Sequence, residues 1–183
     1  MTLFYEGPSA RITQEVFEAL IPYLRDDASF RKRFFSRLKL LYCAGPGLSQ
    51  EVWDDLAEIA LQECGERILF LTGLLSTEAA PHALFGLPDS DRPGLLAAPA
   101  PGIELKLVPA ATGKLEARLR GPNITPGYWR RLALTRAAFD EEGFYKTGDC
   151  LRFADEKDAG KGLVFDGRLG EDIKASSGSW IQP

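Results

Sequence analysis

The stretch LKLLYCAGPGLSQEVWDDLAEIALQECGERILFLTGLLSTE, residues 38–78, decides the fold class that this sequence predicts. It begins with an apolar run that ends at AGPG, which indicates a buried strand followed by a tight glycine loop. Ser49 can then cap an amphipathic helix, and Gly65 stands where a helix C-cap belongs. Residues 68–71 form a second apolar run directly before TGLLSTE. Strand, loop, helix, strand and loop in this order predict an α/β sheet with parallel strands.

Two further helices are expected before this stretch. Thr13 can cap the first, which starts at Gln14, and Pro22 should kink that helix or end it early. The second runs over about residues 28–36. The side chains expected on the inner faces of the three helices are Val16, Phe17, Leu20, Ile21, Leu24, Phe30, Phe34, Phe35, Val52, Trp53, Leu56, Ile59, Ala60 and Cys64.

The sequence pattern changes after about Pro81. Residues 86–102 are rich in Gly, Pro and Ala, and we expect them to be a loop with little regular structure. Apolar residues then alternate with charged ones on both sides of a turn at Thr112-Gly113, which predicts antiparallel or barrel-like strands with one wet face. Two more short strands are expected at residues 144–147 and 162–165. The predicted fold is therefore α/β, with a parallel-sheet portion followed by an antiparallel, barrel-like portion.

The composition is that of an ordinary globular protein, since 45% of the 183 residues are hydrophobic and 26% are charged. A net charge of -4, with both signs spread along the chain, gives no basic patch for nucleic acid or for an anionic membrane. No apolar run approaches the roughly 20 residues of a spanning helix, and MTLFYEGPSAR lacks the pattern of a signal peptide. Three cysteines without metal-ligand spacing and a single histidine, His82, disfavour a zinc site and a histidine triad. We therefore expect a reduced, cytoplasmic protein.

Four polar residues stand at turns where they could contact a nucleotide. The Thr77 hydroxyl can donate to a phosphate oxygen, and the Glu78 carboxylate can hold Mg²⁺. Asp149 offers two acceptor oxygens to the two hydroxyls of a ribose, and the Arg168 guanidinium can bridge phosphate or ribose oxygens. Each has an ordinary alternative: a capped helix start for Thr77 and Glu78, a β-turn for Asp149 and a surface charge for Arg168. Taken singly, each residue fits the ordinary alternative better.

The remaining polar and glycine motifs are less specific. The loop at residues 44–47 could let an adenine ring approach the backbone, or it could be a simple strand-to-helix turn. Lys174 alone indicates a solvated charge. The PGYW motif, residues 126–129, favours packing over binding, and His82 receives no role.

Four segments, taken together and in this order, carry a family resemblance: TGLLSTEAAP, GKLEARLRGPNITPGYW, FDEEGFYKTGDCLRF and GLVFDGRLGEDIKASSGSW. They resemble the signature of the adenylate-forming superfamily, which includes acyl- and aryl-CoA synthetases, luciferases and peptide-synthetase adenylation domains. LSQEVWDDLAEIA and EDIKASSGSW are most similar to the feruloyl-CoA synthase branch. The resemblance covers roughly residues 34–180.

The resemblance implies a role for each matching residue. Thr77 would bind ATP phosphate, and Glu78 would hold Mg²⁺. Asp149 would bind the ribose hydroxyls and Arg168 the ribose and phosphate, while Lys174 would face the pantetheine path of coenzyme A. Thr77, Glu78 and Lys174 are thus the expected catalytic residues. The residues implied to lie near adenine or the acyl group are Gly45, Pro46, Gly73 and Leu74.

The family reaction has two halves. A carboxylate attacks the α-phosphate of ATP to give acyl-AMP and pyrophosphate, and the thiol of coenzyme A then displaces AMP. The implied partners are ATP, coenzyme A and an aromatic carboxylic acid of the hydroxycinnamate class, as in phenylpropanoid catabolism. A small C-terminal domain rotates about a hinge between the two halves. The implied division is an α/β portion of the large N-terminal domain at 1–100, a barrel-like part at 101–168, and the hinge with a C-terminal stub at 169–183.

The sequence departs from the family pattern at several places. Leu74 and Leu75 replace an aromatic residue and a glycine, and the hinge position is Gly170. No glycine-rich phosphate loop precedes residue 34, and the family's catalytic lysine would lie beyond Pro183. We therefore expect a fragment of a CoA ligase that is inactive alone and that self-associates through exposed sheet edges. The alternatives are a non-catalytic remnant that binds nucleotide weakly at most, and one part of a split enzyme.

Overall fold

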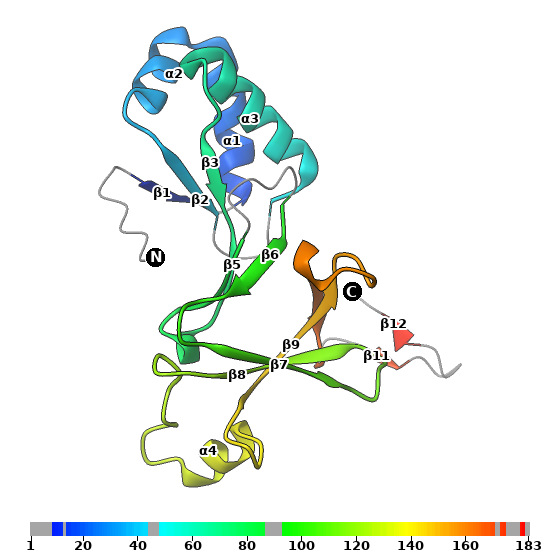
Figure 1. Cartoon of the computed structure of the whole chain (residues 1–183). Helices are drawn as coiled ribbons and strands as arrows, with labels where there is room; N and C mark the ends of the chain where they lie inside the picture. The colour runs from blue at the N-terminus through cyan, green and yellow to red at the C-terminus, as the bar shows by residue number, and fades with distance from the viewer. Residues whose placement is uncertain are drawn as a thin grey trace. The chain divides into compact units, whose positions relative to one another are not determined.

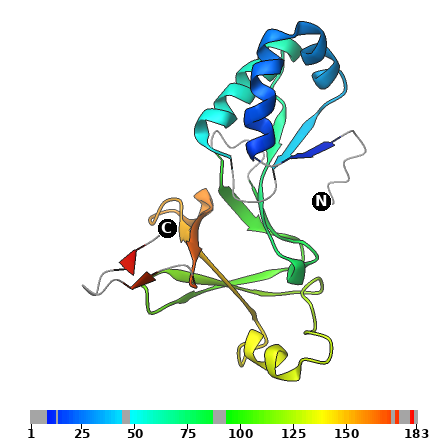
Figure 2. The ribbon, with the colours of Figure 1, turned by 180° about the vertical axis from the view of Figure 1, so that it is seen from behind.

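The structure is a computed structural model that describes residues 9–12, 14–43, 48–86, 93–170, 173–174 and 180–181 (Figures 1 and 2). The chain divides into two compact units. The first comprises Met1–Gly73 with Gly86–Gly94, and the second comprises Leu74–Phe85 with Leu95–Pro183. The expected division at residues 100 and 168 stays a prediction.

The described elements alternate between helices and strands early in the chain and are mostly strands later. Those of the first unit are β1 (Ser9–Ile12), α1 (Gln14–Asp26), α2 (Ala28–Phe35), β2 (Leu40–Cys43), α3 (Gln50–Cys64) and β3 (Leu69–Leu71). Strand β4 (Gly73–Leu75) begins at the boundary between the units. The others are η1 (Thr77–Ala79), β5 (His82–Gly86), β6 (Leu95–Pro99), β7 (Glu104–Pro109), β8 (Leu115–Arg120), α4 (Leu132–Ala138), β9 (Tyr145–Phe153), η2 (Ala159–Lys161), β10 (Leu163–Arg168), β11 (Ile173–Lys174) and β12 (Trp180–Ile181). None of the described helices has the length and apolar character of a membrane span.

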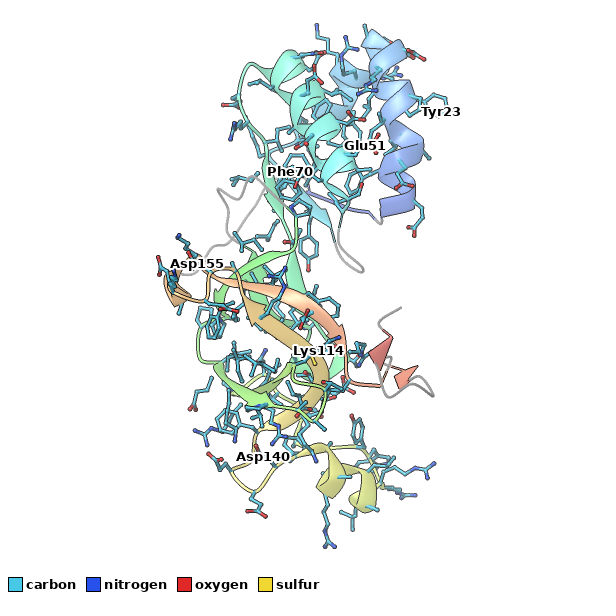
Figure 3. The ribbon with its side chains drawn as sticks, turned by 90° about the vertical axis from the view of Figure 1, so that its right-hand side faces the viewer. Tyr23, Glu51, Phe70, Lys114, Asp140 and Asp155 are labelled. Carbon is cyan, nitrogen blue, oxygen red and sulfur yellow. The ribbon has the colours of Figure 1, made fainter. Side chains whose placement is uncertain are left out.

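The first unit contains the predicted parallel sheet, in the strand order β1-β2-β3. Leu41 of β2 pairs with Phe70 of β3, and both side chains are buried in a core that includes residues of α1, α2 and α3. The Trp53 ring of α3 lies 4.6 Å from the Phe70 ring, which Figure 3 labels. Leu69 belongs to the opposite face of β3 and is 46% exposed. The helices therefore cover one face of the parallel sheet.

The helix caps follow the sequence signals where the structure describes them. The Asp27 carboxylate accepts from the backbone N–H groups of Ser29 and Phe30 and so caps α2. Ser49 accepts from the Val52 N–H and caps α3, as predicted. Gly65 ends α3 with φ of 70°, a conformation that favours glycine. The Thr13 cap lies outside the described residues.

Pro22 is an interior residue of α1, so the helix does not end early there, and the alternative that Pro22 kinks the helix stays a prediction. The helix continues to Asp26. Phe17 and Leu24 are both fully buried and lie on either side of the proline. Packing of this apolar face stabilises the helix despite the one N–H group that a proline cannot supply.

The second unit is built on a seven-stranded sheet in the order β4-β5-β6-β10-β9-β8-β7. Adjacent strands within the run β6-β10-β9-β8-β7 pair antiparallel. This confirms the predicted antiparallel portion. The expectation of a loop over 86–102 was wrong for β6. Its Leu95 and Leu96 are buried and pair with Val164 and Leu163 of β10, so tertiary packing outweighs the weak local strand preference of this Ala- and Pro-containing segment.

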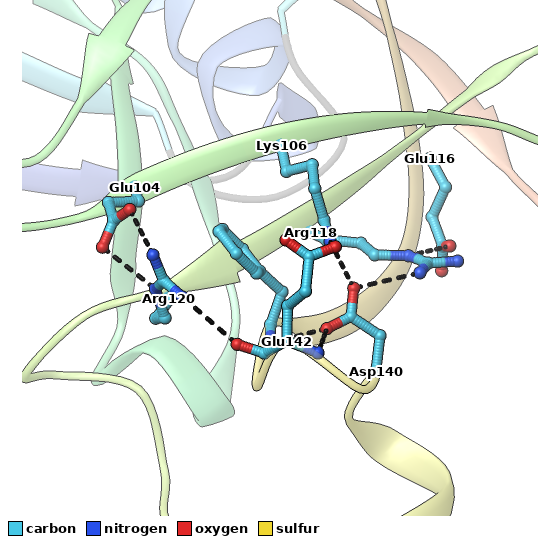
Figure 4. Close-up of polar contacts among 8 residues, drawn as sticks. Glu104, Lys106, Glu116, Arg118, Arg120, Asp140 and Glu142 are labelled. Atoms are coloured by element: carbon cyan, nitrogen blue, oxygen red, sulfur yellow. Dashed lines mark hydrogen bonds and ion pairs between the residues drawn. The ribbon is translucent and has the colours of Figure 1, made fainter.

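An ionic cluster fixes the turn that leads into β9 (Figure 4). The Asp140 carboxylate lies 2.7 Å from Nζ of Lys106 and 3.1 Å from Nη1 of Arg118. It also accepts from the backbone N–H groups of Glu142 and Phe144. Strand β9 is therefore anchored at its start to β7 and β8, and β9 carries several of the candidate site residues.

Candidate nucleotide site

The Ser-Thr-Glu motif forms a closed turn directly after β4. The Ser76 N–H donates to the Pro81 carbonyl at 2.9 Å, and the Ala79 N–H donates to the Ser76 carbonyl at 3.1 Å. Ala79 is fully buried, while Ala80 adopts φ of 48° in the left-handed region. Thr77 is exposed and Glu78 is half-buried. The turn therefore leaves Thr77 exposed and the Glu78 side chain partly accessible to a ligand.

A segment 44 residues away in the sequence holds this turn in place. The Asn123 amide donates to the carbonyls of Ala79 and His82 at 2.5 and 3.0 Å. The Thr125 N–H donates to the Glu78 carbonyl at 2.7 Å. The sequence reasoning missed Asn123 and Thr125. Their signal was an amide and a hydroxyl residue in the turn region that follows the strand ending at Arg120, where side chains often bond to backbone groups.

A tyrosine pair contacts the Glu78 carboxylate. The Tyr128 hydroxyl donates to Oε1 of Glu78 at 2.9 Å, and it lies 3.5 Å from the Tyr145 hydroxyl of β9. Burial raises the pKa of Tyr145, and the hydrogen bond with Tyr128 and the charge of Glu78 raise it further. Tyr145 therefore stays neutral beside the carboxylate across the physiological range.

Asp149 and Arg168 meet on neighbouring strands. They are register partners on β9 and β10, and Nε of Arg168 lies 2.9 Å from Oδ1 of Asp149. The Asp149 side chain is only 13% exposed, whereas that of Arg168 is 54% exposed. The Asp149 N–H donates to Oγ1 of Thr147, which in turn donates to the Ala117 carbonyl of β8. The backbone at Asp149 is thus tied to β8, its carboxylate is mostly buried, and the Arg168 guanidinium is more than half exposed.

Strand β9 connects the two parts of the candidate site. Tyr145 contacts the Glu78 cluster, and Asp149 lies four residues further along the same strand. At a rise of about 3.3 Å per residue, four residues span about 13 Å. Gly148 has φ of 73° at this point, which a side chain would disfavour. Strand β9 therefore joins the surroundings of the Glu78 carboxylate to those of the Asp149–Arg168 pair.

A buried lysine lies beside Arg168, and the sequence reasoning did not single it out. Lys114 is only 8% exposed, and Figure 3 labels it in the second unit. Its Nζ lies 3.2 Å from the position that a Cβ on Gly167 would take. A second cationic group thus borders the backbone next to Arg168.

The remaining predicted site residues are scattered or outside the described part of the chain. Gly73 begins β4, and Leu74 packs against the core of the second unit. Gly45 and Pro46 lie outside the described residues. The backbone of Lys174 pairs with Trp180 in the two-stranded β11–β12 sheet. Apart from its chain neighbours, no described residue has an atom within 4 Å of the position that a Cβ on Gly170 would take, so the expected hinge residue has free space on that side.

The residues of the turn fit a magnesium ion of the kind that nucleotides bring. Among the described residues, no group of three or more His, Cys, Asp or Glu side chains could hold a metal ion. Mg²⁺ that is bound mainly by phosphate oxygens and water needs only one or two protein oxygens. Glu78 offers a carboxylate there, and the neighbouring Ser76 Oγ is buried without a hydrogen-bond partner in the described part of the chain. The donor set therefore suits a nucleotide-bound cation and not a protein-only cage.

Comparison with known proteins gives concordant relatives, although no family model matches the chain. It is 35% identical over 129 residues to the medium-chain fatty-acid–CoA ligase of Escherichia coli K12, a match that covers 64% of this chain and 21% of that ligase. It is 28% identical over 159 residues to the anthranilate–CoA ligase of Pseudomonas aeruginosa PAO1, covering 83% of this chain and 28% of that ligase. A solved malonyl-CoA ligase, in a ternary product complex with methylmalonyl-CoA and AMP, matches with a TM-score of 0.66 and 28% identity. That match covers 95% of this chain and 36% of the solved one, so the chain spans well under half of each of these relatives.

Proposed function

We propose that this chain, which is related in sequence and fold to the acyl-CoA ligases of the adenylate-forming superfamily, forms part of the nucleotide site of an ATP-dependent acid–CoA ligase. The observation that carries the proposal is the pairing of Asp149 with Arg168 on β9 and β10. The same β9 strand reaches Glu78 through Tyr145 and Tyr128. Carboxylate, guanidinium and hydroxyl groups thus gather as a ribose and a phosphate chain require.

Each residue has a defined role in this proposal. The Asp149 carboxylate accepts from the ribose hydroxyls, and Arg168 bridges ribose and phosphate oxygens. The Thr77 hydroxyl donates to a phosphate oxygen. Glu78 would hold the Mg²⁺ that accompanies ATP. The bound ion would neutralise charge on the phosphates. By the family resemblance, Gly45, Pro46, Gly73 and Leu74 would border the adenine or acyl group, and Lys174 would face the path of the pantetheine arm.

The chemistry needs no nucleophilic side chain. In the first half, a carboxylate oxygen of the substrate attacks the α-phosphorus of ATP, and the bond to pyrophosphate breaks. In the second half, the thiolate sulfur of coenzyme A attacks the acyl carbon, and AMP leaves with the bonding electron pair. The contribution of this chain is positioning and electrostatic stabilisation, which supply much of the rate enhancement in such transfers.

The acid substrate is the finer part of the proposal. The relatives described above are named for a medium-chain fatty acid, anthranilate and malonate, so their names do not agree on one acid. The stretches LSQEVWDDLAEIA and EDIKASSGSW favour an aromatic acid of the feruloyl type. A panel of acids with the complete ligase, read as release of pyrophosphate, tests this choice. A preference for saturated fatty acids over ferulate would contradict it.

Binding of ATP to the chain itself tests the proposed site. Isothermal titration in the presence of Mg²⁺ is expected to show saturable binding that Glu78→Gln and Arg168→Gln each weaken by about tenfold, the order of one lost charge-assisted hydrogen bond. Arg152→Gln is the matched control, because Arg152 lies on β9, is 59% exposed and approaches Asp166 only at 4.0 Å. Equal binding by all four proteins would contradict the proposal.

A second candidate function is that of one part of a split ligase. It is favoured by Leu69, which is 46% exposed on the face of β3 opposite the described helices. Co-purification from extract of a partner that carries a glycine-rich phosphate loop supports this alternative. A strictly monomeric chain of 20.1 kDa in extract would contradict it.

A further inference from the structure

We propose that Tyr128 is a positioning residue, whose hydroxyl orients the Glu78 carboxylate toward the cation and phosphates of a bound nucleotide. The inference rests on the proposed nucleotide function of Glu78 and extends it to a residue of the PGYW motif. From the sequence alone, residues 126–129 of that motif were expected to serve packing and not binding.

The contact itself is direct. The Tyr128 hydroxyl donates to Oε1 of Glu78 at 2.9 Å. An ionised carboxylate has about four acceptor positions on its two oxygens, so one hydrogen bond fixes its plane and leaves acceptors for a cation. A hydrogen bond to a charged group is also stronger and shorter than one between neutral groups. The hydroxyl can therefore set the direction of the carboxylate without consuming its ability to bind a cation.

The backbone and the hydroxyl of Tyr128 each have a further contact. The Tyr128 N–H donates to Oγ1 of Thr135 at 2.9 Å, which ties the motif to α4. Gly127 has φ of 143°, and a Cβ there would overlap the Thr135 side chain. The Tyr145 hydroxyl lies 3.5 Å from that of Tyr128. The chain thus approaches α4 at a place that only glycine fits, and this approach aims the Tyr128 ring at Glu78.

The backbone of the turn does not depend on Tyr128. Asn123 bonds to the carbonyls of Ala79 and His82, and Thr125 bonds to the carbonyl of Glu78. These three hydrogen bonds come from residues before the PGYW motif. Loss of the Tyr128 hydroxyl therefore frees the Glu78 side chain and leaves the turn itself in place. This separation distinguishes a positioning role from a merely structural one.

The test is the dependence of ATP binding on Mg²⁺, measured by titration calorimetry on the whole 183-residue chain. The chain, Tyr128→Phe, Glu78→Gln and Tyr23→Phe are each titrated with ATP in excess MgCl₂ and again in EDTA. Tyr23 is a matched control because it is a tyrosine of α1 that is 65% exposed. Amide hydrogen exchange at Ala79 and Thr125 reports separately whether the turn is intact.

The positioning role predicts a specific pattern. Tyr128→Phe lowers the gain in affinity that Mg²⁺ gives by about tenfold or more, the range expected for a hydrogen bond to a charged group. It leaves affinity in EDTA and amide exchange at Ala79 unchanged. Glu78→Gln abolishes the gain, and Tyr23→Phe has no effect.

Three results would overturn the inference, and they differ in what they leave standing. If Glu78→Gln abolishes the Mg²⁺ gain and Tyr128→Phe retains it in full, the positioning role fails while the proposed function stands. If Tyr128→Phe weakens binding equally in MgCl₂ and EDTA, or speeds exchange at Ala79, its role is structural. If the unsubstituted chain shows no Mg²⁺-dependent binding, the proposed function fails and the positioning role fails with it.

Discussion

Asp149 and Arg168 face each other across two antiparallel strands, with Nε of Arg168 2.9 Å from Oδ1 of Asp149. The pair is asymmetric, because the carboxylate is mostly buried and the guanidinium is more than half exposed. A pair that served only stability would gain little from a guanidinium in solvent. An exposed cation beside a fixed carboxylate is, however, suited to a ligand that carries both hydroxyl and phosphate groups.

Asp149→Asn should affect nucleotide binding more than it affects stability. We expect ATP affinity to fall about tenfold. The asparagine amide is uncharged and offers one acceptor oxygen, whereas the carboxylate is charged and offers two. The unfolding free energy should fall by about 1 kcal/mol or less, since the partner Arg168 is largely exposed. Calorimetric titration and urea denaturation of the same preparations measure the two effects. Asp155→Asn is the control, because it removes an exposed pair with Lys161 and should change ATP affinity and stability little. A loss of stability without a loss of affinity in Asp149→Asn would contradict the expectation.

Asn123→Ala should destabilise the second unit. The substitution removes donors to the carbonyls of Ala79 and His82, and buried carbonyls without a partner cost about 1–3 kcal/mol. The midpoint of urea denaturation measures the change. Gln62→Ala removes a comparable amide from the exposed surface of α3, where its partner is Glu58. That control should lie within about 0.5 kcal/mol of the unsubstituted chain, and equal effects of the two variants would contradict a holding role for Asn123.

Stability should fall in acid, below the ordinary Asp pKa of 3.8, because of Asp140. The hydrogen bond from Lys106 holds the pKa of the Asp140 carboxyl well below its ordinary value of 3.8, and bonds from the Phe144 N–H and Arg118 act in the same direction. A lowered folded-state pKa means that the stabilising contribution is present above the unfolded value and is lost as the pH falls through the folded value. In thermal unfolding between pH 7 and pH 2, the stability of the unsubstituted chain should therefore fall more steeply with decreasing pH than that of Asp140→Asn. Parallel curves for the two proteins would contradict this assignment.

Leu56→Ala should disrupt the core of the first unit. Leu56 is fully buried in α3 between the sheet and the other helices, and such truncations cost about 2–5 kcal/mol. Leu61→Ala lies on the same helix, where Leu61 is 48% exposed, and should cost far less. Denaturation followed by circular dichroism at the helix band compares the two. A similar loss in both variants would mean that α3 is not packed as described.

Local signals predicted the helices of the first unit well, except that Val16, expected on the inner face of α1, is 46% exposed. The periodicity and caps of α3 lie entirely within its own sequence, so Ser49 and Gly65 marked its ends correctly. Pro22 misled because its local cost is outweighed by burial of Phe17 and Leu24, which local sequence does not reveal. Strand β6 was missed for the same reason, since its pairing partner β10 lies more than 60 residues away.

The sequence motifs indicated which residues to propose for the candidate site. They did not indicate which of these residues contact one another. The motifs indicated Thr77, Glu78, Asp149 and Arg168 as a set. The register of β9 and β10, which sets Asp149 opposite Arg168, depends on a bulge between Phe165 and Arg168. The contacts of Asn123 and Tyr128 to the Ser-Thr-Glu turn cross more than 40 residues of sequence. Such contacts require the tertiary fold, and a motif search alone does not give them.

The central claim is that one nucleotide contacts both the Ser-Thr-Glu turn and the Asp149–Arg168 pair. The most direct test is a titration of the isotopically labelled chain with ATP and Mg²⁺, followed by backbone amide shifts in nuclear magnetic resonance. The account predicts saturable shifts at Thr77 and Glu78 and, with the same dissociation constant, at Gly148, Asp149 and Arg168. Shifts confined to other residues, or separate dissociation constants for the two groups, would contradict it.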